Sequence, residues 1–131
     1  QYFALRWKVT RNPWGQPVGS EKDELEETSI HFIATASNRS LAGVGRLQFL
    51  DDQTAQVRFM AVDDKFRGLG VGKLLMLEME SIARKKGRTK LFLQARENAV
   101  PFYQSLGYRI LEKTFLLYGE IQHFSMEKMI S

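Results

Sequence analysis

The sequence predicts a mixed α/β fold, with helices packed against a sheet. Two observations lead to this class. Candidate strands bounded by turn residues occupy much of the chain before residue 62, and the apolar residues after Val71 recur at helical spacing. A short strand, a short helix and two final strands then follow. This order of strands and helices favours a mixed sheet.

The first segments are the least regular. The apolar residues of segment 2–11 alternate as in a strand, but Leu5, Lys8 and Val9 also have the spacing of a short helix, so both structures stay open. Residues 12–28 contain two prolines, two glycines and a cluster of acids, which predicts a long loop.

The later elements follow from the apolar period. Strands at 31–36, 41–50 and 55–62, joined by turn residues, predict consecutive antiparallel hairpins. A helix is expected from Val71, with Gly87 placed to close it. The remaining predicted elements are a strand at 91–95, a helix at 99–106 and strands at 108–117 and 121–130.

Composition sets the broad class. The length of 131 residues suits one domain over 1–131, although a chain that begins with Gln1 allows a further strand upstream. The chain contains no cysteine, which excludes disulfides, thiolate metal sites and a cysteine acyl-enzyme. No apolar run approaches a membrane span and no signal pattern opens the sequence, so we expect a cytoplasmic protein without a membrane partner. We also expect no metal.

Charge is unevenly distributed. Five acids and one base between Ser20 and Ile30 give −4 there, so the rest of the chain, whose total is +4, carries +8. This excess is compatible with an anionic cofactor. The basic run at 84–88 lies at the far end of the predicted helix, where cations favour the negative helix end. Nothing resembles a nucleic-acid reading motif, so no nucleic-acid partner is expected.

The stretch KFRGLGVGKLLM at 65–76 contains the most informative pattern. A Walker loop ending at Gly72-Lys73 would need a glycine in place of Arg67 and a hydroxyl residue in place of Leu74. The dinucleotide fingerprint also fails, because Gly68, Gly70 and Gly72 are evenly spaced two apart. What remains is a strand, a turn and a glycine loop that opens a helix.

Such a loop favours an anion. The N–H groups of a first helical turn lack partners, and the helix dipole makes that end positive. Arg67 and Lys73 lie there although cations near a helix N-terminus are disfavoured by roughly 0.3–1 kcal/mol each, so an anion would explain them. The alternative is a tight turn with two solvated cations.

Two motifs resemble the GNAT family of N-acetyltransferases. The strand VRFMAV at 57–62 followed by RGLGVG at 67–72 is similar to the family's acetyl-CoA signature, and AVPFYQSLGY at 99–108 is similar to its second signature. The resemblance covers the chain from about Leu5 to Ile130. It implies a mostly antiparallel sheet of six to seven strands flanked by helices, splayed between the strands at 55–62 and 91–95.

A bacterial subgroup is also suggested. The stretch GSEKDELE and the ending IQHFSMEKM resemble GNAT proteins of which some carry a fused thioesterase domain.

The resemblance implies which residues hold acetyl-CoA. The pyrophosphate would lie on the loop, and the pantetheine arm would pair with the preceding strand. The implied residues are Met60, Ala61, Val62, Arg67, Gly68, Leu69, Gly70, Val71, Gly72 and Lys73. The family often has an asparagine seven residues before its tyrosine, where this chain has Arg96. Asn98 lies five before and could instead be a helix N-cap, so either, or neither, is expected to contact CoA.

The implied activity is direct acetyl transfer to an amine of a small molecule or peptide. Tyr103 matches the family tyrosine that protonates the leaving thiolate, although packing of the short helix is its alternative role. The general base stays open among His31, His123, an acid such as Glu24 or Glu27, and water. The resemblance is also compatible with a homodimer, because dimers are frequent in the family. The alternative functions are a non-catalytic acyl-CoA-binding regulatory module and an acyltransferase that uses longer acyl-CoAs.

Overall fold

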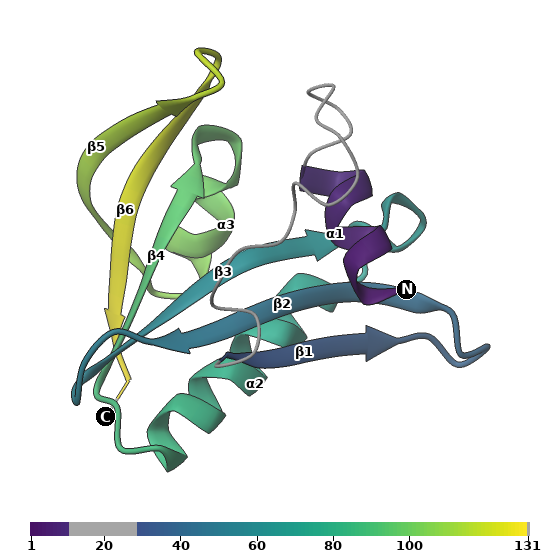
Figure 1. Cartoon of the computed structure of the whole chain (residues 1–131), viewed down its shortest axis with the longest axis horizontal. Helices are drawn as coiled ribbons and strands as arrows, with labels where there is room; N and C mark the ends of the chain where they lie inside the picture. The colour runs from purple at the N-terminus through teal and green to yellow at the C-terminus, as the bar shows by residue number, and fades with distance from the viewer. Residues whose placement is uncertain (11–28, 131) are drawn as a thin grey trace.

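The computed structural model describes residues 1–10 and 29–130 (Figure 1). Its elements are α1 (Tyr2–Thr10), β1 (Ile30–Thr35), β2 (Leu41–Phe49), β3 (Thr54–Val62), α2 (Val71–Lys85), β4 (Lys90–Arg96), α3 (Val100–Ser105), β5 (Arg109–Leu117) and β6 (Ile121–Met129), with 3₁₀ turns at Asp64–Phe66 and Glu97–Ala99. The helical alternative for the first segment is therefore the one observed. The predicted loop at 12–28, with its acids, lies outside the described residues.

The strands form a six-stranded sheet in the order β1-β2-β3-β4-β6-β5. In this sheet only β3 and β4 run parallel, because α2 connects them as a crossover; the other neighbours are antiparallel. This arrangement confirms the predicted mixed, mostly antiparallel sheet.

The parallel pair separates along its length. Pairing runs from Thr54 opposite Lys90 to Val57 opposite Leu93 and goes no further. Figure 1 shows β3 and β4 diverging from this point, with β4, β6 and β5 turning away from the other three strands. The splay that the resemblance implied is thus present.

A bulge in β3 lies at the start of the splay. Val44 pairs with Ala61 but Arg46 pairs with Arg58, so Phe59 and Met60 together oppose Gly45. Phe59 adopts a φ of 57°, in the left-handed region. The extra residue reverses which positions of β3 face each side of the sheet. Val57 therefore packs in the main core beneath α2, whereas Ala61 packs beneath α1.

The two long helices cover opposite faces of the sheet (Figure 1). The buried apolar residues of α2 are Leu75, Met76, Met79 and Ala83, at helical spacing. A Cβ atom on Gly45 would lie 2.2 Å from the Met79 Cε atom, so this glycine allows α2 to approach β2 closely. On the other face, Leu5 of α1 packs on Val44 and Ala61.

A buried ionic group joins α2 to the final strand. Glu80 is only 2% exposed and accepts hydrogen bonds from the Tyr108 hydroxyl, at 2.9 Å, and the Lys128 Nζ atom, at 3.1 Å. Burial and the neighbouring Glu80 carboxylate raise the pKa of the Tyr108 phenol, which stays protonated. A buried carboxylate needs such partners, so this group fixes α2 against β6.

The basic run at 84–88 has structural contacts. Arg84 donates to the Ile130 carbonyl at 3.3 Å, and Arg88 donates through Nε to the Asp51 carbonyl at 3.1 Å. These cations sit at the C-terminal end of α2, as the helix dipole favours.

Candidate functional site

The glycine loop shapes a groove at the N-terminus of α2. Gly68 and Gly70 have φ values of 78° and 84°, a backbone region that other residues rarely adopt. Gly70 is the N-cap, and Leu74 N–H to the Gly70 carbonyl is the first bond of the helix. The N–H groups of Val71, Gly72 and Lys73 have no hydrogen-bond partner in the described chain.

This loop groove has a volume of about 560 Å³. It is lined by Met60, Val62, Phe66, Arg67, Gly68, Gly70, Val71, Gly72, Lys73, Ala99, Phe102, Tyr103, Ser105 and Leu106. The unpaired N–H groups and the cations of the loop can bind an anion, and the apolar residues of the groove can contact a less polar part of the same ligand.

The three glycines have different tasks. A Cβ atom on Gly68 or Gly70 would meet nothing within 4 Å, so these positions face open space where a ligand can approach the protein backbone. A Cβ atom on Gly72 would lie 3.1 Å from the Phe102 ring, so Gly72 instead allows α3 to pack on α2. The loop therefore fits a phosphate-containing ligand, with Gly68 and Gly70 on the open side.

The two cations of the loop differ in their partners. The Arg67 Nε atom lies 2.9 Å from an oxygen of Asp64, so this charge is partly balanced within the turn itself. Lys73 is exposed and forms no ion pair with any residue that the structure describes. The sequence argument that the cations need an anion therefore applies to Lys73 more than to Arg67.

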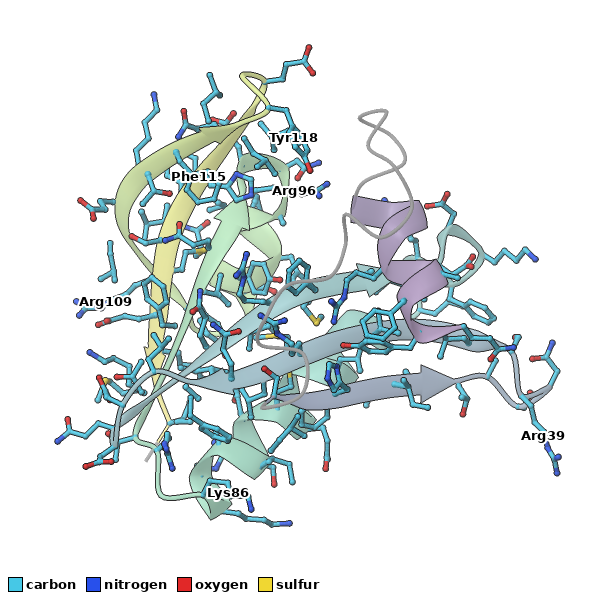
Figure 2. All side chains as sticks on the ribbon, viewed as in Figure 1. Arg39, Lys86, Arg96, Arg109, Phe115 and Tyr118 are labelled. Atoms are coloured by element: carbon cyan, nitrogen blue, oxygen red, sulfur yellow. The ribbon has the colours of Figure 1, made fainter. Side chains whose placement is uncertain are left out.

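A second cavity, here called the strand cleft, lies where β3 and β4 separate. It measures about 220 Å³ and is lined by Gln56, Val57, Arg58, Phe59, Met60, Leu93, Gln94, Ala95, Arg96, Ala99, Tyr103, Phe115 and His123. Figure 2 shows two of these side chains, Arg96 and Phe115, close together near the ends of β4 and β5. Two arginines and no carboxylate are among these described lining residues.

The loop groove and the strand cleft meet at three residues: Met60, Ala99 and Tyr103 line both. Tyr103 is 8% exposed, and its ring makes edge contacts with Phe102 and Tyr108. Burial raises the pKa of the Tyr103 phenol to about 12, so it holds its proton at neutral pH. Its hydroxyl has no hydrogen-bond partner within 1–10 and 29–130, which leaves it available to a ligand.

Most residues predicted to hold the cofactor line the loop groove, but four do not. Ala61 packs beneath α1 because the bulge turns its side chain away, and Leu69 is 69% exposed outside both cavities. Arg96 lines the strand cleft rather than the groove. Asn98 lies in the 3₁₀ turn at Glu97–Ala99 and lines neither. The N-cap alternative for Asn98 is wrong, because Ala99 occupies that position and no side chain caps the helix.

The structure separates the candidate bases. His123 lines the strand cleft, whereas His31 lies on β1 with its Nδ1 atom 2.7 Å from the Tyr2 hydroxyl, away from both cavities. Glu24 and Glu27 lie outside the described residues. Sequence reasoning missed Phe66, Phe102 and Leu106 in the groove, and Phe115 in the cleft. Phe102 and Leu106 flank Tyr103 within one short motif and could have been found, but no sequence signal indicates Phe115.

Known proteins match both the sequence and the fold. The profile of the Acetyltransferase (GNAT) domain matches residues 16–130. This chain belongs to the GNAT acetyltransferase family. A similar GNAT relative is the uncharacterized N-acetyltransferase YjcF of Bacillus subtilis, which is 32% identical over 126 residues, 96% of this chain and 89% of YjcF.

Solved GNAT structures share the fold. A provisionally assigned N-acetyltransferase of Lactobacillus plantarum is 21% identical, with a TM-score of 0.88 over 99% of this chain and 89% of that one. A GNAT acetyltransferase of Elizabethkingia anophelis with acetyl-CoA bound is 17% identical, with a TM-score of 0.74 over 97% and 89% of the two chains. Among the described residues, no helix is long and apolar enough to span a membrane and no acid or histidine cluster could hold a metal.

Proposed function

We propose that this chain is an acetyl-CoA-dependent N-acetyltransferase that transfers an acetyl group directly to an amine of a small molecule or peptide. One observation carries the proposal: Tyr103 lines both the loop groove and the strand cleft. A donor in the groove and an acceptor in the cleft would therefore meet at a single phenol. The Elizabethkingia GNAT structure, which contains acetyl-CoA, supports the choice of donor.

The groove has the features that a CoA pyrophosphate needs. The N–H groups of Val71, Gly72 and Lys73 would donate to phosphate oxygens, and the Lys73 ammonium would add charge. Beyond the loop, Met60 and Val62 line the groove. Because β4 has left β3 at this point, the edge of β3 is available to pair with the pantetheine amides. Backbone contacts would thus align the thioester with the cleft.

Tyr103 would act as the general acid. A general acid must hold its proton before the transfer, and the pKa of the Tyr103 phenol, about 12, keeps it protonated at neutral pH. The groups around it are the rings of Phe102 and Tyr108, which hold the phenol in place. Preorganisation of this kind lowers the cost of proton transfer.

The proposal is tested by incubating the chain with acetyl-CoA and a panel of primary amines while the released thiol is followed. The panel includes neutral amines, amines with a carboxylate or phosphate, and peptide N-termini. Thiol release that depends on one amine class, with the acetylated product identified by mass spectrometry, is the expected result.

Two other outcomes would redirect the proposal. Tight CoA binding without turnover on any amine would favour a regulatory acyl-CoA-binding module. Faster turnover with longer acyl-CoAs in competition with acetyl-CoA would favour a different acyltransferase. A single domain over 1–131, a cytoplasmic location, a homodimer and a link to the thioesterase-fused subgroup stay predictions.

A further inference from the structure

His123 is a buried, titratable side chain of the strand cleft. It pairs with Arg96 across β4 and β6, and it is 6% exposed. The neighbouring pair, Ala95 and Phe124, points to the opposite face, toward the core under α2 and α3. His123 and Arg96 therefore share the face of the sheet away from those helices. Tyr103 enters the cleft from α3, so the two groups approach the cleft from opposite sides of the sheet.

One hydrogen bond fixes the tautomer of His123. Its Nδ1 atom lies 3.0 Å from the Ile121 carbonyl oxygen. A carbonyl only accepts, so Nδ1 carries the proton in the neutral ring and the lone pair is on Nε2. No residue in the described chain bonds to Nε2. The ring is held in place by Phe115, whose centroid lies 4.4 Å away at an interplanar angle of 14°.

The charges around His123 favour its neutral form. Arg96 on β4 and Arg58 on β3 are the charged lining groups of the cleft, α3 contributes the protonated Tyr103, and β5 contributes the uncharged Phe115. Burial has the largest effect and lowers the pKa of His123 below its ordinary value of 6.5; the hydrogen bond to the Ile121 carbonyl opposes this shift, and the Arg96 charge adds to it. At neutral pH the Nε2 lone pair is therefore free to accept a proton.

We propose that His123 is the general base of the acetyl transfer, and that its Nε2 atom takes the proton from the acceptor amine. This inference rests on the proposed function and identifies the base that the sequence left open. A neutral histidine that lines the strand cleft, with an Nε2 lone pair that has no partner in the described chain and with the Tyr103 phenol lining the same cleft, is the arrangement that the reaction requires. His31 does not share it.

The step balances between the two sides of the cleft. The amine nitrogen forms a C–N bond to the thioester carbonyl carbon while one N–H proton passes to His123 Nε2. The C–S bond breaks, and the sulfur takes the Tyr103 hydroxyl proton. The products are an amide and free CoA thiol, with imidazolium at His123 and phenolate at Tyr103. One proton returned from His123 to Tyr103 through solvent restores both groups.

The test compares His123→Asn with the matched control His31→Asn. Asparagine can retain a donor to the Ile121 carbonyl but offers no base, and His31 lies on β1, separated from β3 by β2. We expect His123→Asn to bind CoA normally by calorimetry while kcat falls about 100-fold or more, the usual contribution of a general base. His31→Asn should keep the wild-type kcat.

The pH profile separates a base from a packing residue. Wild-type kcat should fall as pH drops through the pKa of His123, below its ordinary 6.5, because the imidazolium cannot accept a proton. His123→Asn should lack this limb. The base assignment would be overturned if His123→Asn lost rate but still showed the fall in kcat at low pH. It would also be overturned if this variant kept both the wild-type rate and that fall. Neither result would contradict amine acetylation itself.

A readout without turnover completes the test. Long-range ¹H–¹⁵N correlation spectra of the wild-type chain should show His123 as the Nδ1–H tautomer at neutral pH. An imidazolium or the Nε2–H tautomer would overturn the assignment. A wild-type chain that binds CoA but acetylates no amine would instead remove the proposed function, and the base role with it.

Discussion

The loop groove and the strand cleft are built in different ways. The part of the groove suited to phosphate comes from one contiguous stretch, Arg67–Lys73, and uses backbone N–H groups and positive φ angles. The cleft comes from side chains on β3, β4, β5, β6, α3 and the 3₁₀ turn before α3, far apart in sequence. Groups set by local backbone geometry can be inferred from residue spacing. Groups assembled by sheet topology need the fold.

The same contrast predicts different sensitivities. The groove should respond to changes that alter backbone conformation, and the cleft to changes that remove one functional atom. Tyr103 lines both cavities, so a change at this residue can affect the groove and the cleft together.

The largest effect is expected at this junction. Tyr103→Phe removes the phenolic proton and should lower kcat by about 100-fold or more, as the loss of a general acid does. CoA affinity should change little, because the ring and its contacts with Phe102 and Tyr108 remain. Steady-state kinetics and calorimetry with CoA measure the two effects.

The pH dependence of the wild-type chain gives an independent check. A general acid fails when it is deprotonated, and the pKa of Tyr103 is about 12, so Tyr103 should cause no loss of kcat up to about pH 10. Tyr118→Phe, at an exposed tyrosine in the turn between β5 and β6, is the control and should retain full activity (Figure 2). Wild-type turnover by Tyr103→Phe would remove the acid role.

A buried group that supports the groove should show the next largest effect, on stability. Glu80→Gln leaves Lys128 without its carboxylate partner. Breaking a fully buried ion pair costs about 3–5 kcal/mol, and because the Lys128 side chain is 27% exposed and can reach water, we expect a cost of about 2–3 kcal/mol. Because Tyr108 also contacts Tyr103, the loss should loosen the packing around the Tyr103 phenol. Urea unfolding measures the change. Glu78→Gln, exposed on the same helix, should cost almost nothing, and equal costs for the two variants would contradict the structural role.

The groove itself is tested by a change of backbone conformation. Gly70→Val places a β-branched residue at a φ of 84°, and should shift the N–H groups of the first turn of α2. Losing one charge-assisted hydrogen bond, about 1.5–3 kcal/mol, corresponds to about 10- to 100-fold weaker CoA binding. Calorimetry with CoA checks this value.

Gly119 provides a matched control for that change. It has a φ of 71°, and a Cβ atom there also meets nothing within 4 Å, but it lies in the turn between β5 and β6. Gly119→Val should suffer similar backbone strain and keep its CoA affinity. If both variants bind CoA equally well, the pyrophosphate does not lie on the loop.

The fold could be predicted from the sequence wherever one face of an element is uniformly apolar. The period from Val71 to Lys85 identified α2, and the turn residues that bound the apolar runs identified the strands. The first segment was ambiguous because α1 turns Leu5 and Arg6 toward the sheet, and both are buried. A fully buried arginine on the inner face conceals the helical pattern. The bulge at Phe59 was also invisible, because it depends on the pairing of β2 with β3.

The candidate site divides in the same way. Most of the residues that line the loop groove could be named from the sequence, because spacing excluded two other phosphate loops and the resemblance to the GNAT signature lies in one contiguous stretch. His123 could be named only as one of two histidines, since its place in the cleft depends on β6 pairing with β4. The stacking of Phe115 on His123 depends on a further strand pairing, between β5 and β6, which no residue pattern indicates.

The smallest effect tests whether side-chain charge adds to the backbone groove. Lys73 is exposed at the N-terminus of α2 and has no ion pair within the described part of the chain. Exposed charge pairs contribute about 0.2–1 kcal/mol, so Lys73→Gln should weaken CoA binding by at most about fivefold. The loss should shrink as salt rises, because screening weakens the wild-type contact. Lys86→Gln, at the opposite end of α2, should leave the affinity unchanged, and an equal loss in both variants would mean that net charge, rather than a contact at the loop, attracts the cofactor.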